Sequence, residues 1–207
     1  MYDVIVLSRE KILDAALEVV RRRGLAGLSQ RKLAAELGVS AMAMYRHFRD
    51  KEALVHALLD HVIDADALLA HRGDDVERSL IAVFTELRAL FLREPALAPL
   101  AGTPASLGPN GLRFLDGLMG WLAETSRLSA VDATHLVHHA LNYTLGASII
   151  AAGAQSTDAL EAARARFEGL DTAEYPALID AAPHLLGFVS DAMFDRGLRA
   201  ILRAGLQ

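Results

Sequence analysis

The stretch LSQRKLAAELGVSAMAMYRHFRDKEAL, residues 28–54, decides the fold of the N-terminal part of the chain. Its hydrophobic residues recur at helical spacing, and a Gly-Val-Ser at 38–40 interrupts that pattern. A glycine between two short amphipathic segments is typical of a tight turn that joins two helices. The stretch therefore predicts one helix over 29–37, a sharp turn, and another helix from 40 to about 48.

Residues suited to helix ends frame this pair. Ser8, Ser29, Ser40 and Asp50 each stand where an N-cap belongs, because their side chains can accept a hydrogen bond from a free backbone N–H. Gly24 follows three arginines and predicts the end of a first helix. That first helix is expected to bury one apolar face, made of Ile12, Leu13, Ala16, Leu17 and Val20.

Almost all of the remaining chain also shows helical periodicity, which makes the predicted fold class all-α. We expect an N-terminal three-helix helix-turn-helix domain (1–50), a connecting helix (51–74) and a larger C-terminal helical domain (75–207). Within that last domain, the expected helices are 76–92, 111–126, 129–153, 172–182 and 183–206, and the polar segment 154–171 is expected to be a loop, partly helical.

Composition narrows the class of protein. Hydrophobic residues make up 53% of the 207 residues, so a sizeable core can form, and the absence of cysteine excludes disulfides and thiol chemistry. No apolar run reaches the roughly 20 residues of a membrane span. The first ten residues lack the basic start and cleavage site of a signal peptide. We therefore expect a cytoplasmic protein.

Charge is distributed unevenly along the chain. Residues 1–51 contain ten Lys or Arg and six Asp or Glu, a net charge of +4, whereas the whole chain has −5 and the remainder therefore −9. All three lysines stand at or before position 51. A basic N-terminal region on an acidic body indicates that this region alone faces a polyanion.

A helix pair with a tight glycine turn and a third helix packed across it is a helix-turn-helix, and its second helix fits the major groove of DNA. The polar side chains around the expected second helix are suited to contact phosphates or base edges. We expect Ser40, Tyr45, His47 and Lys51 to approach phosphates, and Arg31 to lie near a phosphate or a base.

The same stretch, extended to LSQRKLAAELGVSAMAMYRHFRDKEALVHAL, resembles the DNA-binding domain of TetR-family transcriptional repressors. The matching pieces are LGVS, MYRHF and DKEAL. Further along, LAGTP, NYTLGA and FDRGLRAIL are similar to the tetracycline repressor branch of that family. The resemblance thus implies an effector-binding and dimerisation domain behind the DNA-binding one.

The resemblance implies a set of DNA contacts, namely Gln30, Arg31, Ala41, Met42, Ala43, Tyr45, His47 and Lys51. One departure stands out. The tip of the reading helix is Ala41-Met42-Ala43, where the tetracycline repressor has polar groups. Such a tip cannot hydrogen-bond to base edges, but it can pack against thymine methyl groups. We expect Arg31, Gln30, methyl contacts and DNA shape to set specificity.

The resemblance also implies an effector cavity enclosed by the helices at 75–92, 112–126 and 129–153. Its candidate lining is Phe84, Leu87, Arg88, Phe91, Leu100, Thr103, Leu118, Met119, Trp121, His138, Leu141 and Asn142. The magnesium-binding histidine of the tetracycline repressor falls near Leu100, and its amide and glutamine contacts fall near Ala82 and Leu118. These changes remove the polar side chains that contact tetracycline, so a different and more apolar effector is expected. Each lining residue is equally consistent with ordinary core.

A single helix-turn-helix reads few base pairs, so a homodimer on a palindromic operator is expected. The resemblance places the dimer interface on the helix at 129–153 and on the last helix. The small residues Ala140, Gly146 and Ala147 are the candidates on the first of these. The candidates on the last are Leu185, Phe188, Val189, Ala192, Met193, Leu198, Ile201 and Leu202.

The motif HLVHH places His135, His138 and His139 on one side of a helix. Such a cluster suits a transition metal, but no acidic partner stands at a supporting spacing beside it, and we expect neither a metal nor a cofactor. Two alternatives to a ligand-responsive repressor remain. One is a small metal-dependent enzyme that uses this cluster, although no nucleophile–base motif supports an enzyme. The other is a DNA-binding protein without an effector.

Overall fold

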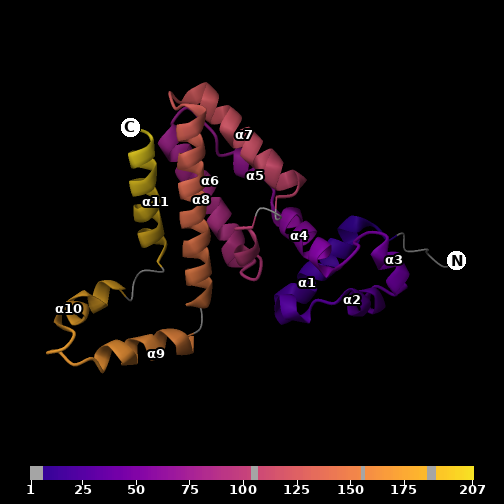
Figure 1. Ribbon diagram of the computed structural model, residues 1–207, viewed down its shortest axis with the longest axis horizontal. Coiled ribbons are helices and arrows are strands. Elements are labelled where there is room, and N and C mark those ends of the chain that lie inside the picture. Colours follow the sequence, from indigo (N-terminus) through magenta and orange to yellow (C-terminus); the bar gives the residue numbers. More distant parts are fainter. Residues whose placement is uncertain (1–6, 104–106, 155–156, 186–189) are drawn as a thin grey trace. The chain divides into compact units, whose positions relative to one another are not determined.

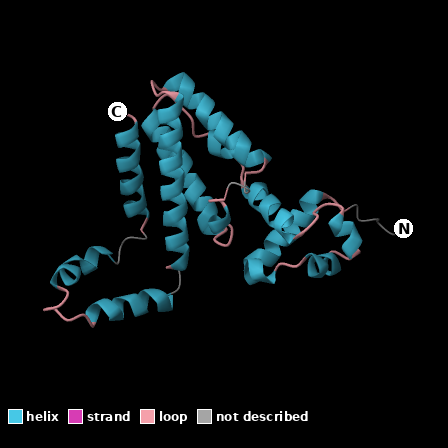
Figure 2. Ribbon diagram, in the orientation of Figure 1, coloured by secondary structure: helices cyan, strands magenta, loops and turns pink. Residues whose placement is uncertain are grey.

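Helices are the only regular secondary structure in the described part of the chain, which confirms the predicted all-α class (Figures 1 and 2). The computed structural model describes residues 7–103, 107–154, 157–185 and 190–207. The chain divides into two compact units, residues 1–66 with 96–115 and residues 67–95 with 116–207. The predicted division by role into 1–50, 51–74 and 75–207 stays a prediction.

The first unit is built on the predicted helix-turn-helix. It contains α1 (Arg9–Gly27), α2 (Gln30–Glu36), α3 (Ala41–Tyr45), α4 (Lys51–Val62), the 3-10 turn η1 (Ala98–Leu100) and the start of α7 (Pro109–Thr125). Helix α1 packs against α4 and α2 against α3. The expected apolar face of α1 is buried, which confirms it.

Three of the four expected N-caps are confirmed. The backbone N–H groups of Lys11, Ala43 and Ala53 donate to the side chains of Ser8, Ser40 and Asp50, at distances of 3.2, 3.2 and 2.7 Å. Ser29 also takes the N-cap position of α2, but its side chain makes no capping hydrogen bond.

We call the helix-turn-helix residues 7–62 the head. Two glycines determine the path of its backbone. Gly38 has φ +67, a region that other residues rarely adopt. The Val39 N–H donates to the Ala34 carbonyl at 2.9 Å and the Gly38 N–H to the Ala35 carbonyl at 3.2 Å. This pair of bonds is a Schellman motif, which ends α2 and turns the chain into α3. Gly24, with φ +64, interrupts α1 where the sequence predicts its end.

The second unit is a helical body with one long helix inside it. Helix α8 (Ala130–Gly153) packs against both α6 (Val76–Arg93) and α11 (Asp191–Gly205) (Figure 1). The short helix α5 (Ala65–Leu69) and α7 each begin in the first unit and end in this one. Helices α9 (Thr157–Glu168) and α10 (Pro176–Leu185) pack against each other.

Apolar side chains from α6, α7, α8 and α11 fill the body. Its buried residues include Leu80, Val83, Phe84, Leu118, Leu122, Leu136, Val137, Leu198 and Leu202. Glycines let α11 approach α8 closely: a Cβ at Gly197 would collide with the Tyr143 hydroxyl, and one at Gly205 with Leu136. The helix pair is therefore fitted at the level of single carbon atoms.

Several helix boundaries differ from the sequence-based expectation. Helix α3 ends at Tyr45 rather than near 48, because the next residues turn toward α4. Helix α4 ends at Val62, with Ile63 extended, and the short α5 follows. β-Branched residues followed by an aspartate weaken a helix, which accounts for this break. The segment expected to be a partly helical loop contains the twelve-residue helix α9.

No helix in the described residues is both long and apolar enough to cross a membrane.

Replacing Gly38 tests the turn. A Cβ there meets no atom within 4 Å, so Gly38→Ala costs only backbone strain, and we expect the free energy of unfolding to fall by about 1–2 kcal/mol. Gly120→Ala is the matched control: it is also uncrowded but lies inside α7, so it should stabilise by about 0.5–1 kcal/mol. Urea unfolding followed by circular dichroism measures both. Equal effects of the two variants would contradict the assigned turn.

Candidate functional site

The outer side of α3 is the most exposed apolar feature of the head. Met42 is 72% exposed and Tyr45 is 47% exposed, while Ala41 and Ala43 are half-buried on either side of Met42. The inner side of α3 is closed, since Met44 is fully buried. The helix thus presents the expected apolar tip outward.

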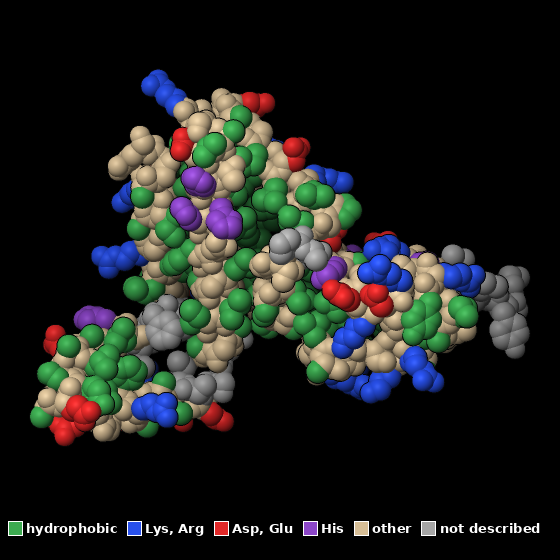
Figure 3. Space-filling view, viewed as in Figure 1, with side chains coloured by type: hydrophobic (Ala, Val, Ile, Leu, Met, Phe, Trp, Pro, Cys, Tyr) green, Lys and Arg blue, Asp and Glu red, His purple; other side chains and the backbone are tan. Residues whose placement is uncertain are grey.

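Cations surround this helix. Arg31 and Lys32 on α2 are exposed, and so are Arg46 and Arg49 in the turn that follows α3. Lysine and arginine side chains are visible on the surface of this unit in Figure 3. An apolar helix tip among exposed cations is suited to a groove between two rows of phosphates.

Arg9 is a residue that sequence reasoning missed. Its guanidinium lies 4.3 Å from the centre of the Phe48 ring, and its Nη1 donates to the His47 carbonyl at 3.1 Å. Both partners lie just after α3, so Arg9 holds the C-terminal end of the reading helix against α1. Only the basic character of α1 signalled it, because a cation over an aromatic ring 39 positions away leaves no local pattern.

Gln30 has a different role from the one its position suggested. Its side chain is 93% buried, and its Nε2 donates to the Phe48 carbonyl at 2.9 Å and to the Asp50 carbonyl at 3.1 Å. Both N–H groups of the amide are therefore used inside the head. A base contact by Gln30 would require exchanging these bonds, so the structure favours a structural role.

The other predicted contacts lie at the surface of the head, and Lys51 also bonds to a backbone group of the head. Ser40 and Tyr45 are exposed and His47 is half-buried. The Lys51 Nζ donates to the Leu25 carbonyl at 2.7 Å, which anchors this cation beside the end of α1. An ammonium group has three donors, so two remain for a phosphate.

Asp50 keeps its negative charge beside these cations. The backbone N–H of Ala53 bonds to its carboxylate and lowers the pKa of Asp50, and the nearby Arg49 guanidinium, 2.8 Å away, lowers it further. The carboxylate thus stays ionised as the N-cap of α4.

The predicted effector lining falls in two groups. Phe84, Leu87, Phe91, Leu118 and Trp121 are buried side chains of the body, and Leu141 and Met119 are half-buried. Leu100 and Thr103 belong to the first unit. Trp121 also lines a shallow pocket of about 590 Å³, whose walls include Arg72, Asp116 and Glu124.

Three of the polar residues in the predicted lining, Arg88, His138 and Asn142, take part in two hydrogen-bonded pairs. Arg88 is buried, and its Nη1 donates to the Asp191 carboxylate at 2.7 Å while its guanidinium lies 4.8 Å from the Phe194 ring centre. His138 and Asn142 are exposed and share a hydrogen bond of 2.9 Å between Nε2 and Nδ2. The first pair fixes the start of α11; the second lies on the surface of α8.

The three histidines of HLVHH lie together on the exposed side of α8, where Figure 3 shows a group of histidine side chains. The rings of His135 and His139, and those of His138 and His139, have centres 6.4 Å apart. Among the described residues, no group of three or more histidine, aspartate or glutamate side chains has a geometry that could hold a metal ion.

Together, a Schellman turn, an exposed reading helix and the cations around it define the head as a helix-turn-helix DNA-binding domain. Comparison with known proteins gives the family. Residues 12–58 match the model of the tetR family of bacterial regulatory proteins, and residues 71–207 match that of the tetracyclin repressor-like C-terminal domain. The chain belongs to the TetR family of transcriptional regulators.

Relatives that match over most of their length support the same family assignment. The chain is 31% identical over 199 residues to an HTH-type transcriptional regulator of Saccharopolyspora erythraea, covering 95% of this chain and 84% of that protein. It is 32% identical over 209 residues to the class A tetracycline repressor of Escherichia coli, covering 95% and 89%. A crystal structure of a possible TetR family regulator from Streptomyces coelicolor A3(2) has a TM-score of 0.78 at 31% identity and covers 95% of this chain and 98% of its own.

Gln30→Ala tests the structural role of this residue. The variant removes the Gln30 donor from the Phe48 carbonyl and one of two donors from the Asp50 carbonyl, which keeps the Leu54 N–H, so we expect the free energy of unfolding to fall by about 1–3 kcal/mol. Lys32→Ala, at an exposed position of the same helix, is the control and should stay within about 0.5 kcal/mol of the wild type. Thermal and urea unfolding measure both. Unchanged stability with weaker DNA binding would instead make Gln30 a DNA contact.

Proposed function

We propose that this chain is a repressor that binds a palindromic operator as a homodimer and is released by a small, largely apolar effector in the cytoplasm. The single observation that supports this most directly is the exposed apolar tip of α3 among the cations of α2 and the following turn. No enzymatic role is part of this proposal.

Specificity comes from few side chains. The Met42 side chain packs against thymine methyl groups, while Arg31 hydrogen-bonds to a base edge from the start of α2. Ser40, Tyr45, His47 and Lys51 hold the phosphates that fix the position of the helix in the groove. Ala41 and Ala43 give the backbone a close approach without adding hydrogen bonds.

The homodimer uses α8 and α11, as the family resemblance implies. Ile149 and Ile150 on α8 are 42% and 50% exposed and Met193 on α11 is 42% exposed, which supports an apolar contact there. Three of the expected interface residues lie instead in the core of one protomer: Ala140, Leu198 and Leu202 are fully buried. Phe188 and Val189 lie outside the described residues. Dimerisation places two reading helices about 34 Å apart on one face of the operator.

The effector occupies the body. One structural neighbour, ActR of Streptomyces coelicolor in complex with actinorhodin, has a TM-score of 0.81, but its 22% identity supports only the shared fold. The class of effector follows from this chain instead. The aromatic and aliphatic side chains of the predicted lining far outnumber its polar groups, and Leu100 stands where the tetracycline repressor has its magnesium ligand. A mostly apolar ligand with one or two polar groups fits such a lining.

Release of the operator requires that effector binding in the body alter the head. The hydrogen bonds of Asp60, which connect α4 to α7, provide a structural link for this coupling. Its Oδ1 accepts hydrogen bonds from the backbone N–H groups of Asn110 and Gly111, both at 2.9 Å, and the Asn110 Nδ2 donates to the Asp60 carbonyl at 3.0 Å. We name this set the α4–α7 clamp. Gly108 is required beside it, because a Cβ there would collide with Asp60.

The clamp joins the last turn of α4 to the first turn of α7, and α7 continues without a break into the second unit. An effector that binds one arrangement of the body more tightly than another would then bias α4 through a single rigid helix. Because α4 is part of the head, a change in the position of α4 changes how well the two heads of a dimer fit the operator.

The two alternatives have less support. A metal-dependent enzyme would need three ligands arranged around one ion, and no group of three among the described residues has that geometry. An effector-free DNA-binding protein would bind the operator but show no stabilisation by any compound in a thermal-shift screen. Footprinting on the DNA upstream of the chain's own gene, with and without screened compounds, separates the two from the proposed repressor.

Arg31→Ala tests the assignment of this residue as a base reader. We expect binding to the footprinted operator to weaken by about 1–3 kcal/mol and discrimination at one base position to relax. Lys32→Ala is the matched control: it should weaken binding to all sequences alike and reduce the salt dependence of the binding constant. Competition binding with single-base operator variants measures both. An unchanged sequence preference in Arg31→Ala would refute the base contact.

Asp60→Ala tests the α4–α7 clamp. In the wild type, operator binding should slow hydrogen exchange of the amides over residues 110–115 of α7, because binding at the head steadies α4. Asp60→Ala removes the acceptor, and most of this slowing should disappear, whereas Asp60→Asn keeps an acceptor oxygen and should retain it. Mass spectrometry with and without operator gives the result. Equal slowing in all three proteins would show that the coupling takes another route.

A further inference from the structure

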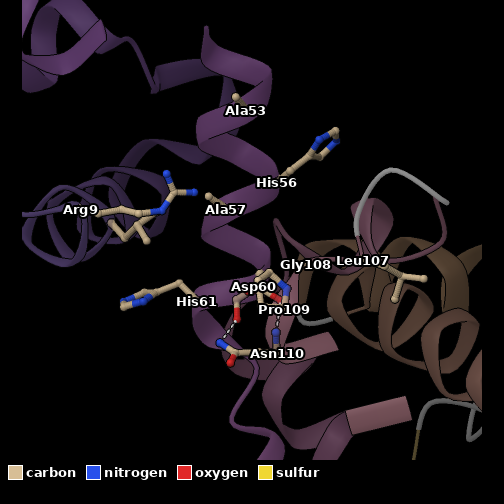
Figure 4. A pocket seen from close by; sticks show the side chains of 11 residues that line it. Arg9, Ala53, His56, Ala57, Asp60, His61, Leu107, Gly108, Pro109 and Asn110 are labelled. Carbon is tan, nitrogen blue, oxygen red and sulfur yellow. Dashed lines mark hydrogen bonds between the residues drawn. The ribbon is translucent and has the colours of Figure 1, made fainter. Parts of the chain in front are cut away.

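A pocket of about 330 Å³ opens in the first unit, over one face of α4. Figure 4 shows its construction: Arg9 and His61 lie on one side of α4, and Leu107 lies on the other. Ala53 and Ala57, one helical turn apart, form its floor. Because alanines cover little of a helix surface, they leave room for a ligand between α1 and the start of α7.

The pocket carries one cation that its surroundings do not neutralise. Arg9 donates one N–H to the His47 carbonyl, and a guanidinium has five such donors, so others remain. His61 is already matched with an acid, since its Nε2 lies 2.8 Å from the Asp14 carboxylate. No ion pair of Arg9 with a carboxylate is found in the described residues.

The acid in the pocket wall is also occupied. Asp60 belongs to the α4–α7 clamp, where two backbone N–H groups donate to one of its oxygens. The positive end of the α7 dipole lies at the same place and offsets its charge. The unmatched charge of the pocket is therefore positive and is located on the α1 side, at Arg9.

Much of the remaining surface is apolar, although His56 and Asn110 also line the pocket. Leu13 of α1 also lines the pocket, the two alanines form the floor, and Leu107, which is 48% exposed, faces them from the opposite side. A cation at one side and an apolar floor and opposite wall favour a ligand of matching polarity. A volume of about 330 Å³ lies at the lower end of the range for small-molecule sites.

We infer that this pocket binds a small carboxylate with an apolar body, separately from the effector site of the second unit. The carboxylate accepts hydrogen bonds from Arg9, which is suited to planar carboxylates, and the apolar body covers Ala53 and Ala57 toward Leu107. Such a site lies within the DNA-reading unit itself.

Occupancy has a direct consequence for α3. Arg9 supports the end of the reading helix through the His47 carbonyl and the Phe48 ring. A carboxylate in the pocket bonds to the remaining donors of the same guanidinium, and its negative charge shifts the guanidinium toward the pocket and away from that end. The ligand therefore lowers operator affinity without acting through the body. This consequence rests on the proposed function, whereas the binding itself does not.

Benzoate is the probe, and the binding test uses the full chain without DNA. Calorimetry and NMR titration compare benzoate with inorganic phosphate, which lacks the apolar body, and with benzyl alcohol, which lacks the charge. We expect saturable benzoate binding that is at least about tenfold tighter than either control, because benzyl alcohol cannot make the charge-assisted hydrogen bond and phosphate cannot cover the apolar floor. Phosphate binding as tightly as benzoate, or no saturable benzoate binding, would overturn the inference.

Variants locate the site. Arg9→Ala and Ala57→Leu should each weaken benzoate binding about tenfold or more, the first by removing the donor and the second by filling the floor. Arg21→Ala, an exposed arginine on α1 outside the pocket, is the matched control and should bind as the wild type does. Arg9→Gln, which keeps a neutral donor, provides a second variant should Ala57→Leu fold poorly. Wild-type affinity in both Arg9 variants would place the ligand elsewhere.

The regulatory arm measures the dissociation constant of the footprinted operator with and without saturating benzoate. We expect benzoate to raise the dissociation constant of the operator about fivefold or more in the wild type and Arg21→Ala, and to leave it unchanged in Arg9→Ala. An unchanged constant despite demonstrated benzoate binding would overturn the regulatory consequence. A chain that binds benzoate but no DNA would contradict the proposed function and leave the pocket in place.

Discussion

The reading head depends on one buried amide. Helix α3 has five residues, too few to be stable alone, and the turn after it places the Phe48 carbonyl outside any helix, while the Asp50 carbonyl accepts from the Leu54 N–H at 3.3 Å at the start of α4. The Gln30 side chain bonds to both and thereby ties the end of α3 and the start of α4 to the first turn of α2. With the Schellman turn at Gly38 fixing the other end, the short helix is held at both termini by its neighbours.

At the end of α4, one side chain again bonds to several backbone groups. A single carboxylate, Asp60, caps the first turn of α7, and the neighbouring glycine leaves space for it. Hydrogen bonds between a side chain and free backbone N–H groups at a helix start are local and directional, so they fix the position of that start relative to α4. The start and the end of α4 are thus both fixed by side chains that satisfy backbone groups.

Much of the fold was predictable because its signals are local. Gly38 between two amphipathic segments predicts the turn, and Ser40 and Asp50 predict the starts of two helices, since turn and cap chemistry depends on neighbouring residues. The apolar stripe of α1 predicts its buried face for the same reason. The tip at Met42 was implied by the family resemblance, and the structure shows this side chain 72% exposed.

The rest depended on contacts between distant residues. The sequence does not show whether the Gln30 amide faces DNA or a loop twenty residues away, because the carbonyls at 48 and 50 to which it donates are distant in the chain. Arg9 over Phe48 and Asp60 with Asn110 are likewise pairs far apart in the chain. In the body, a leucine such as Leu198 has the same helical spacing whether it faces its own core or a second copy, so burial had to be seen.

The exposure of Met42 has a consequence for how such a protein diversifies. This side chain contributes little to the core, so exchanging it leaves the free energy of folding almost unchanged, while it occupies the centre of the surface that we propose meets the bases. Stability and recognition are therefore assigned to different residues of one short helix. A lineage carrying this head can acquire a new target sequence by single substitutions at that position, without first rebuilding the scaffold that presents it.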